Sequence, residues 1–245
     1  MQYGLLGKSL NHSFSKAYFE KKFQDLHLTD CQYSNFEIDS IDKIKSLIKD
    51  TPNLVGLNVT IPYKEAVLPF LDELSSEAKE IRAVNCIRIQ NGKLIGYNTD
   101  VYGFAQSIKP FLDVNHQRAL ILGTGGASKA VAQALKKVGV EIYFVTSSQT
   151  KKTNNTFFYS ELNELVLNAF KLIVNTSPVG TFPHVKECPN IPYQFISPQH
   201  LAYDLIYNPA QTLFLQKAKE KGAITVNGLS MLQLQAEKSW EIWNA

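Results

Sequence analysis

The sequence contains few cysteines and none of the spacings that cysteine-based sites require. Among its 245 residues, Cys31, Cys86 and Cys188 are odd in number and far apart. No CxxC pair and no cysteine–histidine cluster with zinc-ligand spacing occurs. The pattern predicts free thiols in a reducing compartment, and we expect no bound metal.

Long apolar runs and strong charge are also absent. No run of 18 apolar residues could span a membrane, and the first ten residues do not resemble a signal peptide. The net charge of +3 is scattered, without the basic runs or aromatic–basic ladders of nucleic-acid binding proteins. We therefore expect a cytoplasmic globular protein with no membrane segment and no nucleic-acid partner.

Known local signatures of hydrolases are missing as well. There is no HExxH motif and no G-x-S-x-G elbow. The five histidines are scattered, and His12 is interpreted as a surface or packing residue although it lies beside two serines.

Apolar patterning alternates between strand and helix in two series. The first includes a buried strand over residues 54–59 and a hairpin over 86–97, in which Asn91-Gly92 fits a type I′ turn. The second begins after Pro110, and its polar run 147–156 is predicted to be an exposed loop. This rhythm predicts an α/β fold with mainly parallel sheets, divided into two domains between residues 100 and 110.

The stretch "ALILGTGGASKAVAQAL" places Gly123, Gly125 and Gly126 between a strand and a helix. Backbone N–H groups at such a helix start can face a pyrophosphate, and the helix dipole favours the anion. Ser128 stands where the dinucleotide fingerprint has its third glycine. A purely structural turn is the alternative, but the context favours a Rossmann-type domain.

The end of the next strand bears on the choice of cofactor. Val145 is followed by Thr146, Ser147, Ser148 and Gln149, and then by two lysines. The acid that would bind a ribose 2′-hydroxyl in an NAD site is absent. This favours NADP(H), although a solvated basic loop would look the same.

A lysine follows the apolar strand 54–59 in "NVTIPYK". Lysine is seldom buried, and strand ends in α/β proteins are common places for sites. Lys64 could be a surface lysine in an ordinary salt bridge, but Asn58, Thr60 and the later Asn98-Thr99-Asp100 favour a catalytic interpretation.

Eight segments then carry a resemblance to a known family. In chain order they are "NHSFS", "NVTIPYK", "AVNC", "GYNTDVYGF", "LGTGGASKAV", "VNTSP", "YDLIYNP" and "GLSMLQLQA". Together they resemble the shikimate dehydrogenase family over nearly the whole chain. Each motif alone is weak evidence for the family, but eight motifs in the matching order are hard to obtain by chance.

The resemblance implies a two-domain enzyme of aromatic amino-acid (chorismate) biosynthesis. It would reduce 3-dehydroshikimate to shikimate reversibly with NADPH. Residues 1–100 would form the substrate domain, completed by the C-terminal helix 229–245, and residues 101–228 would form the Rossmann-like NADP domain. We expect a monomer or a homodimer.

The resemblance also implies roles for individual residues. Lys64 would be the general acid/base, paired with Asp100, because an ammonium can give both charge and a proton to the oxygen formed by hydride transfer. The substrate-binding residues would be Ser13, Ser15, Asn58, Thr60, Asn85, Tyr207 and Gln235. Helix capping is the alternative for the two serines and for Asp100, and a surface amide is the alternative for Gln235.

The implied cofactor-binding residues are Gly123, Gly125, Gly126, Ala127, Thr146, Ser147, Lys151, Thr176 and Gly228. One departs from the family pattern, because Ser147 stands where the usual arginine is expected. Lys151 could compensate, and affinity for the 2′-phosphate depends on that.

Three other functions stay open from the sequence. One is a quinate/shikimate dehydrogenase that prefers NAD. Another is a non-catalytic dinucleotide-binding regulator, which the joint presence of Lys64 and Asp100 disfavours. A folate-linked methylene dehydrogenase is more remote, because it leaves Ser13, Ser15 and Asn85 unexplained.

Overall fold

The computed structural model describes residues 1–10 and 13–245, so the interpretation of His12 lies outside the described residues. The chain forms two compact units. Unit 1 comprises Met1–Thr99 and Ala236–Ala245, and unit 2 comprises Asp100–Gln235. The second division falls inside the last helix, α9 (Leu229–Asn244), so both units contain part of that helix.

Unit 1 is built on a mixed six-stranded sheet with the order β2-β1-β3-β5-β6-β4. β1 pairs in parallel with β2 and β3, whereas β5 is antiparallel to both of its neighbours. The elements are β1 (Gln2–Gly7), α1 (Phe14–Asp25), β2 (Gln32–Glu37), α2 (Ile44–Asp50), β3 (Leu54–Val59), α3 (Tyr63–Ala66), β4 (Glu73–Leu74), α4 (Ser76–Ile81), β5 (Cys86–Gln90) and β6 (Lys93–Tyr97).

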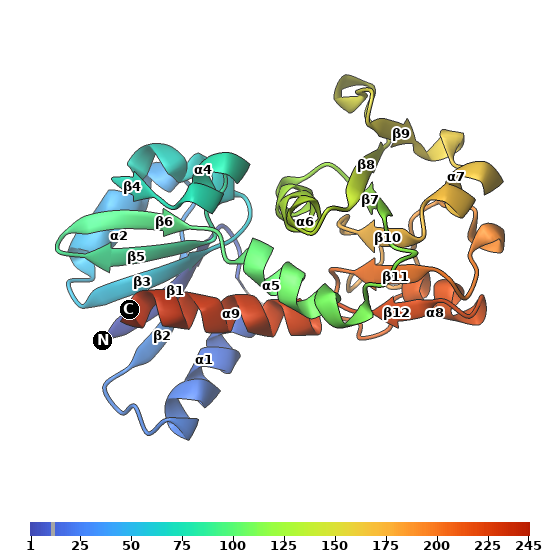
Figure 1. Ribbon diagram of the computed structural model, residues 1–245. Helices are drawn as coiled ribbons and strands as arrows, with labels where there is room; N and C mark the ends of the chain where they lie inside the picture. The colour runs from blue at the N-terminus through green and yellow to red at the C-terminus, as the bar shows by residue number, and fades with distance from the viewer. Residues whose placement is uncertain (11–12) are drawn as a thin grey trace. The chain divides into compact units, whose positions relative to one another are not determined.

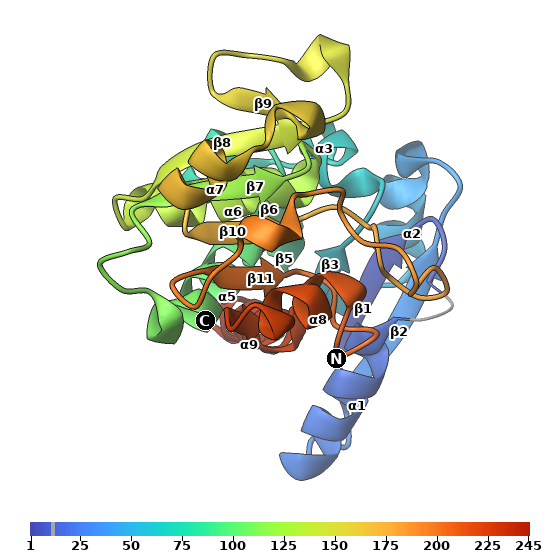
Figure 2. The same ribbon diagram turned by 90° about the vertical axis from the view of Figure 1, so that its right-hand side faces the viewer.

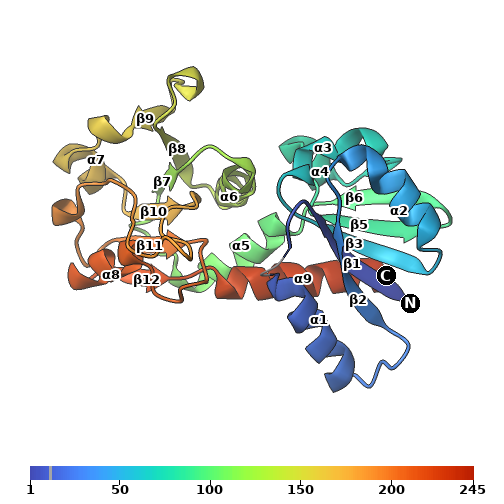
Figure 3. The same cartoon turned by 180° about the vertical axis from the view of Figure 1, so that it is seen from behind.

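Alternation along the strands of unit 1 supplies a core on each face of the sheet. Leu6 and Leu57 belong to one core, and Tyr3 and Leu5 belong to the other. Side chains of consecutive strand residues point to opposite faces, which produces this division. Helices α1 and α9 lie on one side of the sheet, and α2, α3 and α4 lie on the other (Figure 3). The predicted hairpin is confirmed, because Asn91 and Gly92 have φ of 52° and 78° between β5 and β6.

Unit 2 contains a parallel six-stranded sheet with the order β12-β11-β10-β7-β8-β9. Numbered from β7, this is the strand order 3-2-1-4-5-6 of dinucleotide-binding folds. Its elements are α5 (Asp100–Ile108), β7 (Arg118–Leu122), α6 (Gly126–Lys137), β8 (Glu141–Thr146), β9 (Thr156–Phe158), α7 (Glu164–Ala169), β10 (Leu172–Asn175), β11 (Leu201–Asp204), α8 (Leu213–Glu220) and β12 (Ile224–Val226). The stacked strands of unit 2 are visible in Figure 2.

Helices cover both faces of this sheet. α5 and α6 lie on one side, while α7 and α8 lie on the other (Figure 1). Leu120 and Ile173 contribute to the core on the α7–α8 side, together with Phe214 of α8. Burial on both faces explains why these strands are continuous apolar runs rather than alternating ones. The predicted Rossmann-type fold of this region is confirmed.

One prediction for unit 2 needs correction. The polar run 147–156 was expected to be an exposed loop, but Thr156 is buried and begins β9, the edge strand beside β8. Only three residues form β9, and its hydrogen-bonding partner is β8. A segment this short shows no alternating pattern that would predict a strand from sequence.

All three cysteines are free; Cys31 and Cys86 are buried, and Cys188 is half-buried. Within the described ranges, no helix has the length and apolar character needed to cross a membrane.

Candidate active site

Lys64 lies in the short helix α3 just after β3. Its backbone carbonyl accepts a hydrogen bond from the Val84 N–H at 2.7 Å, and Thr60 N–H donates to the Leu6 carbonyl at 2.9 Å. Both Thr60 and Lys64 are half-buried. The turn between them is therefore held at both ends, by β1 on one side and by the segment before β5 on the other.

Two serines mark the start of α1. Ser13 occupies the N-cap position, but its side chain makes no capping hydrogen bond. Its Oγ is buried and has no hydrogen-bond partner among the described residues. Capping therefore does not account for Ser13, and a buried hydroxyl without a partner is suited to receiving a ligand. Ser15 is 9% exposed and hydrogen-bonds the hydroxyl of Tyr33.

Tyr33 continues this contact into the sheet. Its hydroxyl donates to Asn58 Oδ1 at 2.9 Å. Burial raises the pKa of Tyr33 well above its ordinary value, and the bond from Ser15 offsets this only in part. Tyr33 thus stays protonated and acts as a fixed donor to Asn58. No sequence pattern indicates this role, because Tyr33 looks like any inward residue of an alternating strand.

Asn58 is 4% exposed, and both sides of its amide are engaged. Its Nδ2 donates to Ser239 Oγ at 2.9 Å and to the Asn85 carbonyl at 3.4 Å. Ser239 lies on α9 and is fully buried. The C-terminal helix therefore contributes a hydroxyl directly to this group.

Asn85 and Thr99 complete the buried network. Thr99 N–H donates to Asn85 Oδ1 at 2.6 Å, and Asn85 Nδ2 donates to Thr99 Oγ1 at 3.0 Å. Thr99 Oγ1 also lies 3.2 Å from Ser239 Oγ. We call the six residues Ser15, Tyr33, Asn58, Asn85, Thr99 and Ser239 the polar network of unit 1. It brings together three of the predicted substrate-binding residues. Thr99 was noted only as part of the Asn98-Thr99-Asp100 segment, and Tyr33 and Ser239 were not predicted.

Asp100 follows Thr99 directly and is the first residue of α5 in unit 2. It is 8% exposed. Two residues earlier, Asn98 Nδ2 donates to the Ala83 carbonyl at 3.0 Å. The segment before Asp100 is therefore fixed by side-chain bonds to Ala83 and Asn85.

The glycine loop of unit 2 has the geometry of an anion-binding turn. Gly123 has φ of 107°, a conformation that favours glycine. A side chain on Gly123 would also lie 3.1 Å from Thr176 Oγ1, whereas one on Gly125 would meet nothing within 4 Å. The space at Gly125 faces the start of α6, where Gly126 and Ala127 form the first turn. A pyrophosphate fits this combination of open space and helix N-terminus.

Ser128 explains why the third fingerprint glycine is dispensable. It is 1% exposed, and its Oγ donates to the Gly125 carbonyl at 2.6 Å. A small hydroxyl thus packs inside the turn and stabilises it.

The loop after β8 carries the residues predicted to choose the cofactor. Thr146 is buried, and its Oγ1 accepts from Ser148 N–H at 3.1 Å. Ser147 and Lys151 are exposed. Lys151 Nζ donates to the Thr124 carbonyl at 3.4 Å, which places its ammonium beside the glycine loop. Lys152 instead pairs with Glu161.

A buried carboxylate holds the loops that follow β10 and β11. Asp204 is fully buried and accepts from Thr212 Oγ1 at 2.6 Å and from Asn175 Nδ2 at 3.0 Å. It also accepts from the Ile206 N–H at 3.1 Å. Burial raises the pKa of Asp204 to about 6, although these three hydrogen bonds lower it. Thr176 follows Asn175, and its Oγ1 donates to the Leu122 carbonyl at 2.8 Å.

The remaining predicted residues belong to later segments of unit 2. Tyr207 is half-buried, and burial raises its pKa. Gln235 is 8% exposed and packs where Gly103 of α5 approaches α9 closely. Gly228 is not beside the glycine loop, because β11 and β10 separate β12 from β7. A side chain on Gly228 would lie 2.0 Å from the Leu205 carbonyl, so close packing requires a glycine here. Contact between Gly228 and the cofactor stays a prediction.

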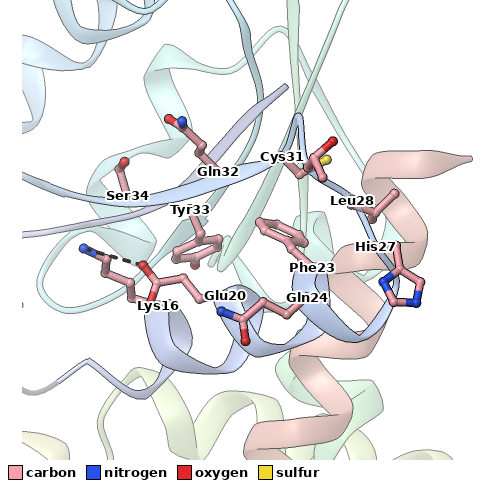
Figure 4. Close-up of a pocket in the computed structure, with 11 residues that line it drawn as sticks. Lys16, Glu20, Phe23, Gln24, His27, Leu28, Cys31, Gln32, Tyr33 and Ser34 are labelled. Carbon is pink, nitrogen blue, oxygen red and sulfur yellow. Dashed lines mark ion pairs between the residues drawn. The ribbon is translucent and has the colours of Figure 1, made fainter.

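A surface pocket of about 700 Å³ lies between α1 and β2 in unit 1 (Figure 4). Lys16 and Glu20 form an ion pair at 3.8 Å on its helix side. The Tyr33 ring also lines it, while Ser15, Asn58 and Asn85 do not. The pocket therefore shares only Tyr33 with the polar network. Among residues 1–10 and 13–245, no group of three or more His, Cys, Asp or Glu side chains could hold a metal ion.

Comparisons with known proteins point to one family. A family model described as the shikimate dehydrogenase substrate binding domain matches residues 5–87. A shikimate dehydrogenase (NADP(+)) of Carboxydothermus hydrogenoformans is 41% identical over 98% of this chain and 90% of its own.

Solved structures are similar over the full length. The shikimate dehydrogenase of Aquifex aeolicus is 34% identical, with a TM-score of 0.88 over 100% of this chain and 92% of its own. The Thermus thermophilus enzyme in complex with NADP(H) and shikimate is 30% identical, with a TM-score of 0.87 over 99% of this chain and 93% of its own. With this similarity in sequence and fold, the chain belongs to the shikimate dehydrogenase family.

Proposed function

We propose that this chain reduces 3-dehydroshikimate to shikimate, reversibly and with NADPH, as a step in the biosynthesis of aromatic amino acids. The observation that carries the proposal is the polar network of unit 1. It orders amides and hydroxyls from helices α1 and α9, from strands β2 and β3, and from the residues next to β5 and β6. Such groups can donate or accept, which suits a substrate that bears several hydroxyls.

In this proposal the substrate carboxylate binds at the start of α1. Ser13 has a buried hydroxyl without a partner among the described residues, so donation to a carboxylate would satisfy it. Ser15, in the first turn of α1, would add a second donor by turning its hydroxyl hydrogen from Tyr33 to the carboxylate. Two neutral donors can hold a carboxylate without an arginine.

Lys64 is proposed to be the general acid, with Asp100 as its partner. Two facts support the pairing. The backbone of Lys64 is bonded to Val84. The side chain of Asn98 is bonded to the neighbouring Ala83. The backbone of Lys64 and the side chain of Asn98, two residues before Asp100, are thus bonded to adjacent residues of one segment. A carboxylate beside an ammonium keeps it charged and fixes its rotamer.

The cofactor would bind to unit 2 and supply the hydride. Gly123, Gly125, Gly126 and Ala127 would hold the pyrophosphate at the start of α6. Thr146, Ser147 and Lys151 would contact the ribose phosphate, and Thr176 would border the site. The ammonium of Lys151, already beside the glycine loop, is proposed to replace the missing arginine. Tyr207 and Gln235 are proposed to contact substrate.

The domain roles follow the same proposal. Residues 1–100 and the C-terminal helix would hold substrate, and residues 101–228 would hold NADP(H). A monomeric or homodimeric state and a cytoplasmic location stay predictions from sequence.

The test is a steady-state assay at 340 nm with shikimate or quinate and with NADP or NAD. We expect turnover of shikimate with NADP, with kcat/KM at least about 10-fold above that for the other three combinations. Higher kcat/KM with quinate and NAD would favour the broader dehydrogenase. Cofactor binding without any turnover would contradict the proposal and favour a regulator.

A further inference from the structure

Ser239 occupies a position in unit 1 at which several buried segments meet. It is fully buried on α9. Its Oγ accepts from Asn58 Nδ2 at 2.9 Å and lies 3.2 Å from Thr99 Oγ1. It also hydrogen-bonds the thiol of Cys86. The predicted site residues on this helix end at Gln235, one turn earlier, so the role of Ser239 is unassigned.

The bonds around Asn58 permit one orientation of its amide. Nδ2 faces Ser239 and the Asn85 carbonyl, and Oδ1 faces the Tyr33 hydroxyl. Reversing the amide would place Oδ1 against the Asn85 carbonyl, with no hydrogen between the two oxygens. Both amide hydrogens are therefore used within the protein. Asn58 can offer a substrate only an acceptor, on Oδ1.

Ser239 also connects this amide to the chain segment that leads to Asp100. Thr99 is bonded to Asn85 through its N–H and its hydroxyl, and its hydroxyl lies beside Ser239 Oγ. One hydroxyl on α9 thus contacts both a predicted substrate-binding residue and the residue that precedes the predicted catalytic carboxylate. A shared hydrogen-bonding group of this kind fixes the geometry of its partners.

We propose that Ser239 is a positioning residue for the reaction, which orients Asn58 toward substrate as an acceptor and holds Thr99 in place before Asp100. The inference rests on the proposed function. It gives α9 a role in the reaction besides completing the core of unit 1.

The first test is Ser239→Ala in the full chain, compared with Ser107→Ala. Ser107 offers a matched control because it is 4% exposed and its Oγ lies 2.6 Å from the Tyr203 hydroxyl. We expect Ser239→Ala to lower kcat/KM for shikimate by about 10- to 100-fold, the scale of small misplacements in a site. NADPH affinity should change less than about two-fold. Ser107→Ala should lower Tm comparably but keep kcat/KM within about two-fold.

A double-mutant cycle separates positioning from general loss of stability. If Ser239 acts partly through Asn58, the two substitutions are not independent. The fold-loss in kcat/KM of the double variant Asn58→Ala/Ser239→Ala should then be at least about three-fold smaller than the product of the two single fold-losses. Asn58→Ala combined with Ser107→Ala should give the full product.

Two results would overturn the inference. One is a folded Ser239→Ala protein that keeps more than half of the wild-type kcat/KM. The other is a cycle in which the losses multiply as in the control pair. If Ser239→Ala fails to fold, Ser239→Cys keeps the volume with a weaker hydrogen-bonding group, and should show an intermediate loss and the same coupling. Wild-type protein without shikimate turnover would contradict the proposed function itself, and this inference with it.

Discussion

The hydroxyl of Tyr33 donates to Asn58 Oδ1 at 2.9 Å, and so joins β2 to β3 across the intervening strand β1. Tyr33 is 3% exposed and also contacts Ser15. This one phenol therefore connects the start of α1, where the substrate carboxylate is proposed to bind, with the amide at the end of β3.

Removing that hydroxyl should weaken both stability and substrate binding. Tyr33→Phe leaves Asn58 Oδ1 without its donor, so the free energy of unfolding should fall by about 1 kcal/mol. The KM for shikimate should rise several-fold, because Ser15 and Asn58 lose a common partner. Urea unfolding and steady-state kinetics measure the two effects. Tyr193→Phe, whose hydroxyl donates to the Pro189 carbonyl at 2.8 Å, is the control and should leave KM unchanged. An unchanged KM in Tyr33→Phe would contradict the connection.

Lys151 should determine preference for the phosphorylated cofactor. Its ammonium lies beside the Thr124 carbonyl of the glycine loop. Lys151→Ala should raise the KM for NADPH by about 10-fold or more, the effect of losing one hydrogen bond to a charged group. The KM for NADH should stay the same, because NADH has no 2′-phosphate. Lys152→Ala is the control, since Lys152 pairs with Glu161. Equal effects on both cofactors would contradict this role.

Asp204 should make a pH-dependent contribution to stability. Burial raises its pKa to about 6 from an ordinary value of 3.8. The folded state therefore holds this proton more tightly than the unfolded state between those values. Its contribution to stability is present below about pH 4 and is lost as pH rises through about 6. A difference of this size between the two pKa values corresponds to about 3 kcal/mol in the free energy of unfolding.

The measurement is urea unfolding of wild type and Asp204→Asn from pH 4 to pH 7. Relative to Asp204→Asn, wild type should lose about 3 kcal/mol over that range. Asp50→Asn, at an exposed position, is the control and should follow wild type. A constant difference between wild type and Asp204→Asn would show that the carboxylate titrates normally.

Two buried histidines should act in the opposite direction. Burial lowers the pKa of His116 and of His200 below 6.5. The Nδ1 atoms accept backbone N–H bonds at 3.0 Å, from Asp113 and Ser197 respectively, so both rings are built in as neutral groups. Stability should be full above pH 6.5 and fall as pH drops from there toward the folded-state pKa values.

Replacing one of these rings should make the free energy of unfolding depend less steeply on pH between pH 5 and pH 7. His200→Asn should show a weaker loss of unfolding free energy between pH 7 and pH 5 than wild type does. His184→Gln is the control, because the His184 side chain is 73% exposed. A slope that is the same in all three proteins would contradict the assignment.

The sequence predicted the layout well where signals are local. The hairpin at Asn91-Gly92, the strand 54–59 and the glycine turn all depend on short patterns. Strand β9 was missed because three residues cannot display a period, and its pairing with β8 comes from tertiary structure.

The network around the site shows the same limit. Ser15, Asn58 and Asn85 were found because they lie in motifs. Tyr33 and Ser239, which connect them, lie 206 positions apart in the chain (239 − 33) and belong to no motif. Nothing in an alternating strand or an amphipathic helix distinguishes an inward hydroxyl that packs from one that orients an amide.

Asp204 was missed for a related reason. The segment "YDLIYNP" directed attention to Tyr207, whereas the buried carboxylate beside it makes the hydrogen bonds that hold the loops. A signal existed, since an acid at the end of an apolar strand must find partners when it is buried.

The most direct test of the account is the turnover of Lys64→Ala. Loss of the general acid/base should lower kcat for the oxidation of shikimate by about 10²- to 10⁴-fold, with the Kd for shikimate changed only a few-fold. Lys79→Ala, on the exposed side of α4, should keep wild-type kcat. A folded Lys64→Ala protein with kcat within about two-fold of wild type would contradict the account.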